Sequence, residues 1–373
     1  MIPGSATPEG TAAFAEKSDA HAGNYRKFAG LTLSNVGLGT YLGDADDRTD
    51  ALVSDAMIRS VRAGINVIDT AINYRGQKAE RSVGKAAAEL IDRGIASRDQ
   101  LFICTKGGYV TNDADVGLGF WEYVKQEYTD PGIVSSGDIT PSYHCMTPSY
   151  LSDQIDRSLR NMGLECIDLV YLHNAAEGQM SNVTREEFLG SLRDAMAMYE
   201  ERRSEGKIRY YGMATWECFR VDDASPLYLS LADICSMAEE VGGKDHGFRF
   251  VQMPFNLYYD QALLKKNQAV GEGEGEGGRR HLSVLDAASE LGIGVFTSVP
   301  FMQGRLLQSG TMPDFLDLDP SLRALQFIRS APGVLAPLVG QKTPEHVQDN
   351  TRIMKIKPLE QPEFSELVSR LTS

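Results

Sequence analysis

The feature that most constrains this chain is an alternation of short apolar runs with longer amphipathic segments. Apolar runs of this length, bounded by polar loops, are typical of strands buried in a parallel sheet. They occupy residues 33–39, 65–69, 101–105, 167–172, 208–213, 248–253, 293–297 and 334–339. Helical patterns follow, for example at residues 50–62, 78–93, 149–161, 185–205, 281–291 and 344–354. Eight such units favour the α/β class and a (β/α)8 TIM barrel; a doubly wound open sheet is the alternative.

We expect a single domain with long loops on the C-terminal rim of the barrel, because 373 residues suit a barrel with insertions. Residues 1–22 lack an apolar core and a basic start, so we expect a disordered N-terminal tail and not a signal peptide. The barrel is then expected over residues 23–373, with insertions at 107–146 and 268–280. The second insertion contains an acidic glycine-rich spacer, residues 271–278, in which we expect no chemistry.

Charge and composition exclude several classes of function. A net charge of -14 argues against nucleic acid and anionic membranes as partners. No run approaches the ~18 apolar residues that a membrane span needs. The five cysteines are widely spaced and form no C-x-x-C pair, which indicates reduced thiols and a cytoplasmic protein. The six histidines form no H-x-x-x-H pair, so we expect no metal site.

Polar side chains follow three consecutive predicted strands. Asp69 ends the second strand, Tyr74 lies five residues later, Lys106 ends the third strand and His173 ends the fourth. Active sites of β/α barrels lie at the carboxyl ends of their strands. Any one of these residues alone would have a structural explanation, but four in succession on one rim indicate a catalytic site.

These four side chains suit the reduction of a carbonyl group. Hydride addition leaves an alkoxide that needs a proton, and the phenol of Tyr74 can supply it. The ordinary pKa of a phenol is ~10, and a neighbouring ammonium such as that of Lys106 lowers it. Asp69 would pair with Lys106, and His173 would donate a hydrogen bond to the carbonyl oxygen and orient the substrate. We therefore predict an oxidoreductase that converts an aldehyde or ketone to an alcohol.

The same residues carry a resemblance to the aldo-keto reductase superfamily, from about Tyr25 to Met354. Residues 64–74 are similar to the motif G-x-x-x-x-D-T-A-x-x-Y, and residues 158–173 resemble S-L-x-x-L-x-x-x-x-x-D-L-x-x-x-H. Residues 37–41 and 103–106 resemble the first strand and the lysine-bearing strand. The resemblance implies a β/α barrel, an NADPH cofactor and a catalytic tetrad at Asp69, Tyr74, Lys106 and His173.

The resemblance also implies a cofactor site. Its expected residues are Gly39, Thr40, Tyr41, Asp69, Thr215, Gln252, Ser298, Pro300, Phe301, Gln303, Gly304, Arg305, Gly340, Gln341, Lys342, His346 and Asn350. Two positions depart from the family. Residues 212–215 (GMAT) replace G-x-S-N, so Thr215 and Gln252 would have to hold the nicotinamide amide, and Ser298 stands where many members have an aromatic residue.

The choice of cofactor and the binding of the substrate depend on further residues outside the tetrad. Lys342, at the start of a predicted helix, would meet the 2′-phosphate of NADPH, with NADH as the alternative. The long loop 107–146 carries aromatic residues that would either wall a substrate pocket or simply hold the loop in place. The expected substrate-binding residues are Tyr41, Tyr74, Tyr109, Trp121, His173 and Asn174. The expected partner is a small-molecule carbonyl compound, and the expected state is a monomer or a weak homo-oligomer.

Parts of the sequence suggest three other functions. Gly37, Gly39 and Gly43 imitate a dinucleotide-binding loop, but the acidic residues 44–47 that follow would repel a pyrophosphate. A hydrolase with paired acids lacks a carboxylate partner for Asp69 on an adjacent strand end. The alternative left open is an NADPH-binding barrel that senses redox state or regulates a partner and has little turnover.

Overall fold

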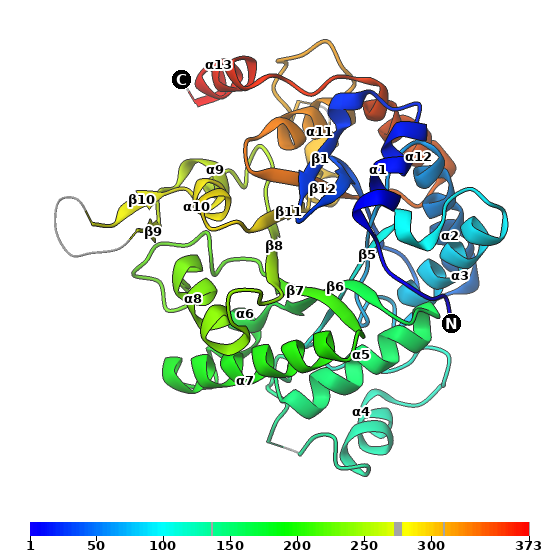
Figure 1. Ribbon diagram of the computed structural model, residues 1–373, viewed down its shortest axis with the longest axis vertical. Helices are drawn as coiled ribbons and strands as arrows, with labels where there is room; N and C mark the ends of the chain where they lie inside the picture. The colour runs from blue at the N-terminus through cyan, green and yellow to red at the C-terminus, as the bar shows by residue number, and fades with distance from the viewer. Residues whose placement is uncertain (136, 272–277, 309, 373) are drawn as a thin grey trace.

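The computed structural model describes residues 1–373 except 136, 272–277, 309 and 373. A closed barrel of parallel strands forms its centre, and its last strand pairs with its first (Figure 1). The strands are β3 (Gly37–Gly39), β4 (Val67–Asp69), β5 (Phe102–Gly107), β6 (Ile167–His173), β7 (Ile208–Ala214), β8 (Phe248–Pro254), β11 (Gly294–Ser298) and β12 (Val334–Gly340). The predicted (β/α)8 TIM barrel is thus confirmed, and the open sheet is excluded.

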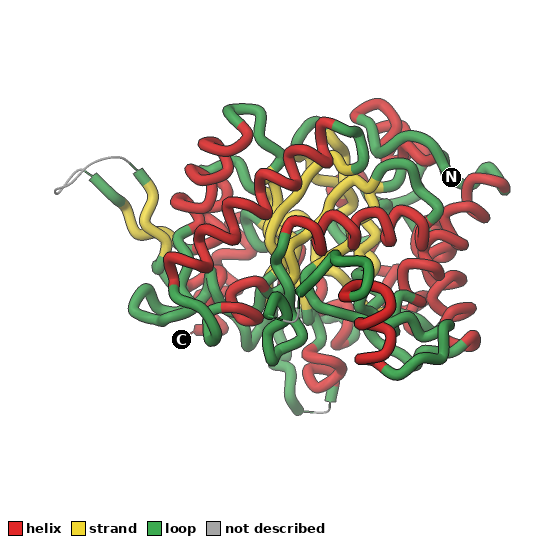
Figure 2. The backbone as a smooth tube through the Cα atoms, turned by 90° about the horizontal axis from the view of Figure 1, so that it is seen from below, coloured by secondary structure: helices red, strands yellow, loops and turns green. Residues whose placement is uncertain are grey.

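Helices form a ring around the strands (Figure 1), and in the side view they flank the yellow strands (Figure 2). The principal ones are α2 (Asp47–Arg62), α3 (Lys78–Asp92), α5 (Pro148–Met162), α7 (Arg185–Ser204), α8 (Leu231–Gly242), α10 (Val284–Glu290), α11 (Pro320–Ser330), α12 (Pro344–Thr351) and α13 (Gln361–Thr372). Their starts follow ordinary capping chemistry. The Asp46 carboxylate accepts a hydrogen bond from Thr49 N at the start of α2 (2.7 Å), and the Thr343 hydroxyl accepts one from His346 N at the start of α12 (3.3 Å).

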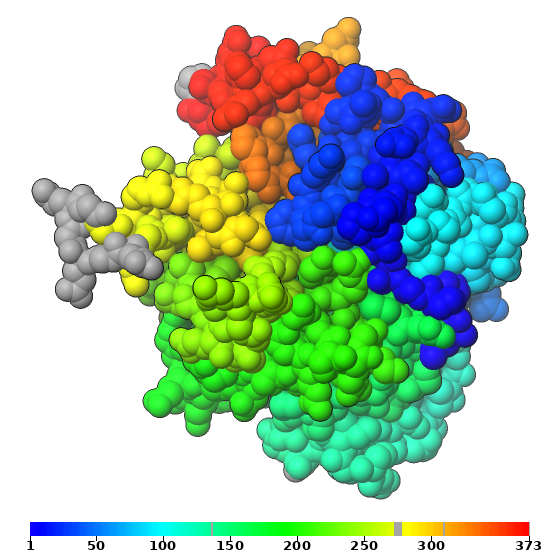
Figure 3. Space-filling view, viewed as in Figure 1, coloured from blue at the N-terminus to red at the C-terminus, as the bar shows by residue number. Residues whose placement is uncertain are grey.

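The inside of the barrel is filled with side chains. Phe250 stacks on Phe296 with ring centroids 5.7 Å apart, and Phe102 lies 5.4 Å from Phe250. The hairpin β1 (Tyr25–Phe28)–β2 (Leu31–Ser34) covers the N-terminal end, where Phe28 meets the Phe250 ring at 5.0 Å. In Figure 3 the N-terminal residues, in blue, lie over the face turned to the viewer. With the interior filled and this end covered, ligands are confined to the opposite rim.

The first apolar run, residues 33–39, belongs to two elements instead of one strand. Its beginning forms the end of β2, and only Gly37–Gly39 joins the barrel as β3. The break is fixed by Asn66, whose side-chain oxygen accepts a hydrogen bond from Ser34 N (2.8 Å) and whose amide donates to Thr32 O (3.0 Å). Periodicity could not show this break, because both halves are buried and apolar.

The expectation of a disordered tail over residues 1–22 is wrong. Pro8–Lys17 form helix α1, which the Thr7 hydroxyl caps, and Ile2 forms a strand-like bridge with Leu164. The buried carboxylate of Asp168 accepts a hydrogen bond from Ala6 N (2.7 Å) and also pairs with Arg98 (2.7 Å). The segment is held by these polar contacts and by few apolar side chains, which is why its composition resembled that of a free tail.

Both insertions contain secondary structure. Residues 107–146 include α4 (Phe120–Val124), which continues into a π-helical turn, Lys125–Thr129. In the second insertion β9 (Gln268–Val270) pairs with β10 (Arg280–Leu282), so the predicted helix 281–291 begins only at Val284. The central part of the predicted spacer, residues 272–277, lies outside the described residues.

None of the helices that the structure describes combines the length and the apolar character that a crossing of the bilayer requires.

Candidate active site

The carboxyl ends of the strands open into a cavity of about 690 Å³. Nearly all predicted site residues line it: Gly39, Thr40, Tyr41, Asp69, Tyr74, Tyr109, His173, Asn174, Thr215, Gln252, Ser298, Pro300, Phe301, Gln303, Gly304, Gly340, Gln341, Lys342, His346 and Asn350. Lys106 is buried beside the cavity, where it contacts Asp69. Trp121 lines a neighbouring cavity, and Arg305 is exposed and lines neither.

Three predicted catalytic residues meet because β4 and β5 are adjacent in the barrel. The Lys106 ammonium donates to Asp69 Oδ2 (2.6 Å) and to the carbonyl oxygen of Thr70 (2.9 Å). The same ammonium lies 4.8 Å from the centroid of the Tyr74 ring. Asp69 and the backbone therefore fix a buried positive charge beside the phenol of Tyr74.

Burial has a large effect on the ionisation of Tyr74 and Lys106. It raises the pKa of the Tyr74 phenol above the ordinary 10.0, although the Lys106 ammonium opposes the shift. The sequence predicted the direction of the lysine's influence but not the larger effect of burial. Burial alone would lower the pKa of Lys106, yet the charges of Asp69 and Tyr74 outweigh it and raise that pKa. At neutral pH the phenol therefore keeps its proton and the lysine keeps its charge.

His173, at the end of β6, completes the predicted set. Its ring centroid lies 6.0 Å from that of Tyr74 and 5.1 Å from that of Tyr109. Burial, with help from the charge of Lys106, lowers the pKa of His173 well below 6.5. The imidazole is therefore neutral and can donate one hydrogen bond toward the cavity.

Sequence reasoning missed His144, which supports His173 from the insertion. Its Nε2 lies 2.7 Å from the carbonyl oxygen of His173, and its Nδ1 lies 2.9 Å from the side-chain nitrogen of Gln179. Gln179 is the last residue of α6 (Ala175–Gln179). Burial lowers the pKa of His144 to about 4, so the ring is neutral and donates from Nε2. No strand-end or motif signal marks His144 in the sequence.

The turn after β7 departs from the expectation for Thr215. The Thr215 hydroxyl lies 2.6 Å from Glu177 Oε1 and donates to it, so it has only acceptor capacity left for a ligand. The same carboxylate oxygen accepts hydrogen bonds from Trp216 N (2.8 Å) and Glu217 N (2.7 Å). Glu177 was missed because it lies within the short helix α6, away from any strand end. Of the two residues that we expected to hold the nicotinamide amide group, Gln252 is therefore the one whose side chain can donate a hydrogen bond to it.

The loop after β11 has an unusual backbone. Val299, Met302 and Gln303 have φ angles of 58°, 49° and 55°, in the left-handed region. This region is strained for a β-branched residue such as Val299, and such strain is typical of ligand-binding loops. Asn256 holds the loop in place, because its side-chain amide donates to the carbonyl oxygen of Val299 (2.9 Å).

The far end of the cavity suits an anion. Lys342, His346, Asp349 and Asn350 line it, and α12 begins there at Pro344 with Thr343 as its cap. A helix N-terminus offers free N–H groups and a partial positive charge. The cavity thus runs from the buried Lys106–Asp69 pair beside Tyr74 to the start of α12 with Lys342, and its residues fit a dinucleotide.

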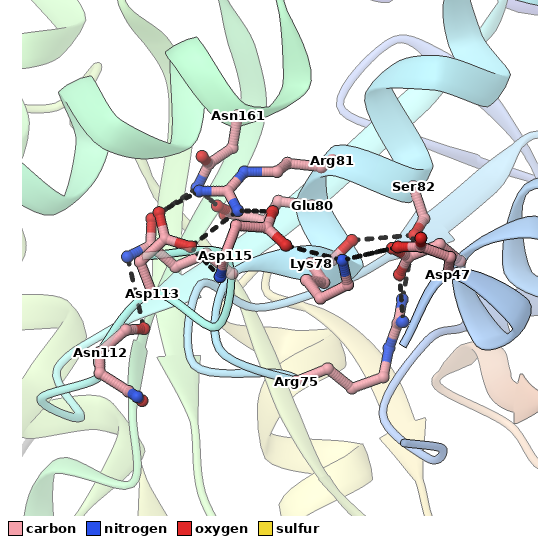
Figure 4. Close-up of polar contacts among 12 residues, drawn as sticks. Asp47, Arg75, Lys78, Glu80, Arg81, Ser82, Asn112, Asp113, Asp115 and Asn161 are labelled. Atoms are coloured by element: carbon pink, nitrogen blue, oxygen red, sulfur yellow. Dashed lines mark hydrogen bonds and ion pairs between the residues drawn. The ribbon is translucent and has the colours of Figure 1, made fainter. Parts of the chain in front are cut away.

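The insertion is fastened to the segment that carries Tyr74. The ammonium of Lys78 contacts carboxylates on both sides of it, Asp50 at 2.9 Å and Asp115 at 2.8 Å, and Arg81 pairs with Asp113 and Asp115 (Figure 4). Between them Ala114 N donates to the carbonyl oxygen of Gly76 (3.1 Å). A side chain at position 76 would collide with Ala114, with its Cβ 3.0 Å from that backbone nitrogen. These contacts join residues 113–115 to the loop that follows Tyr74.

Comparisons with known proteins agree with this geometry. The model of the aldo/keto reductase family matches residues 35–314. The chain is 24% identical over 351 residues to an uncharacterized oxidoreductase of Bacillus subtilis, covering 91% of this chain and 93% of that one. It is 28% identical over 192 residues to the NADH-specific methylglyoxal reductase of Escherichia coli, covering 49% of each chain. An aldo/keto reductase from Klebsiella pneumoniae, solved with NADP and acetate, has the same fold (TM-score 0.59, 18% identity, 93% and 95% coverage).

The ion pairs of residues 113–115 lead to a testable expectation. The double substitution Asp113→Asn and Asp115→Asn should make the insertion more susceptible to limited proteolysis. High salt should produce part of the same effect in the unaltered protein, because exposed ion pairs are screened over a Debye length of about 10 Å at 0.1 M. Gel electrophoresis of timed digests measures the cleavage rate.

Asp130→Asn is the matched control, because Asp130 forms an exposed ion pair with Lys125 within the same insertion. An equal increase in cleavage for this control would show that residues 113–115 do not fasten the insertion.

Proposed function

The chain belongs to the aldo/keto reductase family of carbonyl oxidoreductases, and from this premise we propose that it reduces an aldehyde or ketone with Tyr74 as proton donor. The observation that carries the proposal is the buried Lys106–Asp69 ion pair (2.6 Å) beside the Tyr74 ring, at the rim where the cavity opens. A surface pair would have little consequence, but a buried ammonium is held only where its charge is compensated.

The cofactor proposed for the cavity is NADPH, with NADH as the alternative. A bound nicotinamide would supply a hydride to the carbonyl carbon. Gln252 would hold its amide group, the strained loop 299–304 would surround the pyrophosphate, and α12 with Lys342 would face the adenosine end. NADPH is favoured because Lys342 supplies a cation near the start of α12. NADH remains the alternative because the relative from Escherichia coli is NADH-specific by name.

Residues of the chain polarise the carbonyl group and supply the proton. His173 donates a hydrogen bond to the carbonyl oxygen and so polarises the bond. When hydride arrives at the carbon, the oxygen gains negative charge and the Tyr74 phenol transfers its proton to it. The product is an alcohol, and the resulting phenolate is stabilised by the Lys106 ammonium, whose own charge is balanced by Asp69. Burial keeps the phenol protonated until the oxygen becomes basic enough to take the proton.

Tyr74→Phe tests the proton donor. We expect the substitution to abolish carbonyl reduction, by about 10²-fold or more in kcat, because general acid catalysis supplies roughly that factor. NADPH binding, followed by fluorescence titration, should change little. A variant with near-normal kcat would contradict the assignment of Tyr74. If the unaltered protein binds NADPH but reduces no carbonyl compound, the regulatory alternative is favoured.

Lys342→Ala tests the choice of cofactor. A contact with the 2′-phosphate predicts that NADPH binding weakens by about tenfold, the effect of about 1.4 kcal/mol, while NADH binding changes little. Lys355→Ala is a matched control, because Lys355 is a surface lysine that bonds the carbonyl oxygen of Asp19, outside the cavity. Equal weakening of both cofactors by Lys342→Ala would exclude a 2′-phosphate contact.

A further inference from the structure

A second cavity of about 520 Å³ adjoins the first one, and the two share Asn73 and Tyr109. Its other lining residues come from the insertion: Val110, Thr111, Phe120, Trp121, Ser142 and Tyr143. The predicted substrate residue Trp121 belongs to this cavity and not to the first. We name Phe120, Trp121 and Tyr143, with the cavity that they line, the aromatic compartment.

The rings of the aromatic compartment pack against one another and still leave their outer faces open. Phe120 lies 5.0 Å from Trp121 and 5.1 Å from Tyr143, both edge to face, and Trp121 lies 5.7 Å from Tyr143. Trp121 is nevertheless 58% exposed and Tyr143 47% exposed. Large aromatic side chains that are ordered but uncovered indicate a binding surface.

The surrounding backbone is built to hold these rings. Tyr143 has a φ angle of 57°, which costs free energy for a residue with a side chain. Two backbone hydrogen bonds maintain it, from Tyr143 N to Thr140 O (2.9 Å) and from Val110 N to Tyr143 O (2.7 Å). Phe120 packs against a small core that includes the fully buried Tyr128, from the insertion, and Tyr150, from α5. The backbone hydrogen bonds and this core therefore give the aromatic compartment a defined shape.

The aromatic compartment continues from the proposed reaction centre. The Tyr109 ring lies 5.1 Å from the His173 ring, and Asn174 fixes its hydroxyl at 3.2 Å. Tyr109 lines both cavities, so a substrate whose carbonyl meets His173 and Tyr74 can extend past Tyr109 onto Trp121.

The chemistry of the lining defines the occupant. Among the described residues that line the second cavity none carries a charge, and its polar groups are amides and hydroxyls. On the adjoining side of the first cavity Asp69 is the charged lining residue, and it is neutralised by Lys106. A phosphate or carboxylate on the substrate would find no cation here, and the net charge of -14 would repel it.

We propose that the aromatic compartment binds an uncharged aromatic ring carried by the carbonyl substrate, so that the natural substrate is a neutral arylalkyl aldehyde or ketone. The reaction in this inference rests on the proposed function, whereas the binding of the aromatic ring does not. The ring stacks on Trp121 while the carbonyl reaches His173.

The kinetic test compares three aldehydes: propanal, 3-phenylpropanal and 3-(4-carboxyphenyl)propanal. The phenyl group should raise kcat/KM over propanal by about tenfold or more, because ring burial and stacking are worth at least that factor. The carboxylate of 3-(4-carboxyphenyl)propanal should remove this gain in kcat/KM. Trp121→Ala combined with Tyr143→Ala should lower the ratio of phenylpropanal to propanal toward one, whereas Trp121→Phe should retain most of it.

Val116→Ala is the matched control, because Val116 is exposed on the same insertion and lines neither cavity. It should leave the ratio unchanged. A double variant that keeps the ratio of the unaltered protein would overturn the proposal, as would an unaltered protein that prefers the carboxylated aldehyde.

A binding measurement separates this proposal from the proposed function. The chain has two tryptophans, so Trp216→Phe leaves Trp121 as the sole fluorophore of that type. Titration with 3-phenylpropan-1-ol should quench or shift its emission, and propan-1-ol at the same concentrations should not. Such a response without any aldehyde turnover would support the aromatic compartment and contradict the reductase. Aldehyde turnover without any fluorescence response and without selectivity for the phenyl group would support the reductase and contradict the aromatic compartment.

Discussion

The buried ion pair between Lys106 and Asp69 is the interaction on which the rest of the site depends. Removing two charges from water costs several kcal/mol for each ion, and only close geometry offsets that cost. Here the two atoms lie 2.6 Å apart, and Thr70 O accepts a second hydrogen bond from the ammonium. Adjacent strands of a closed barrel supply this geometry, because neither strand can slip without breaking the register of its neighbours.

The remaining parts of the rim keep neighbouring groups in place around that charge. His144, which Gln179 holds in place, bonds the backbone carbonyl oxygen of His173. The Glu177 carboxylate accepts hydrogen bonds from all three residues of the turn 215–217. These contacts all run from one rim loop to another. Asp69, Lys106 and His173 stand on barrel strands, and Tyr74 lies in the turn after β4. The segments between them are tied together, and fixed positions of this kind are what preorganised catalysis requires.

The parts of the structure that the sequence predicted are those with local signals. Buried parallel strands are continuous apolar runs, and Asp69, Lys106 and His173 each end such a run, so the barrel and the meeting of the tetrad were accessible. The orientation of the Thr215 hydroxyl was not accessible from the sequence, because it depends on a hydrogen bond that the hydroxyl donates to a residue 38 positions away.

Long-range polar contacts also explain the other differences. The N-terminal segment is ordered by the Asp168 carboxylate, 162 residues from Ala6, and composition alone does not show such a partner. His144 lies in an insertion without strand-end signals, and Arg305 follows two residues with left-handed backbone that turn it away from the cavity. For the N-terminal segment and for His144, the deciding contact joins segments whose separate sequences look unremarkable as loops or tails.

The most direct test of this account is the pH dependence of hydride transfer, measured in single turnovers with NADPH and an aldehyde. If Tyr74 is the donor beside a charged Lys106, the rate of the unaltered protein should be constant between about pH 6 and 9, because burial raises the phenol pKa above 10.0 and lowers the His173 pKa well below 6.5. Lys106→Met should be slow across this whole range. A rate that titrates near pH 6.5, or a Lys106→Met variant as fast as the unaltered protein, would contradict the central role of the buried pair.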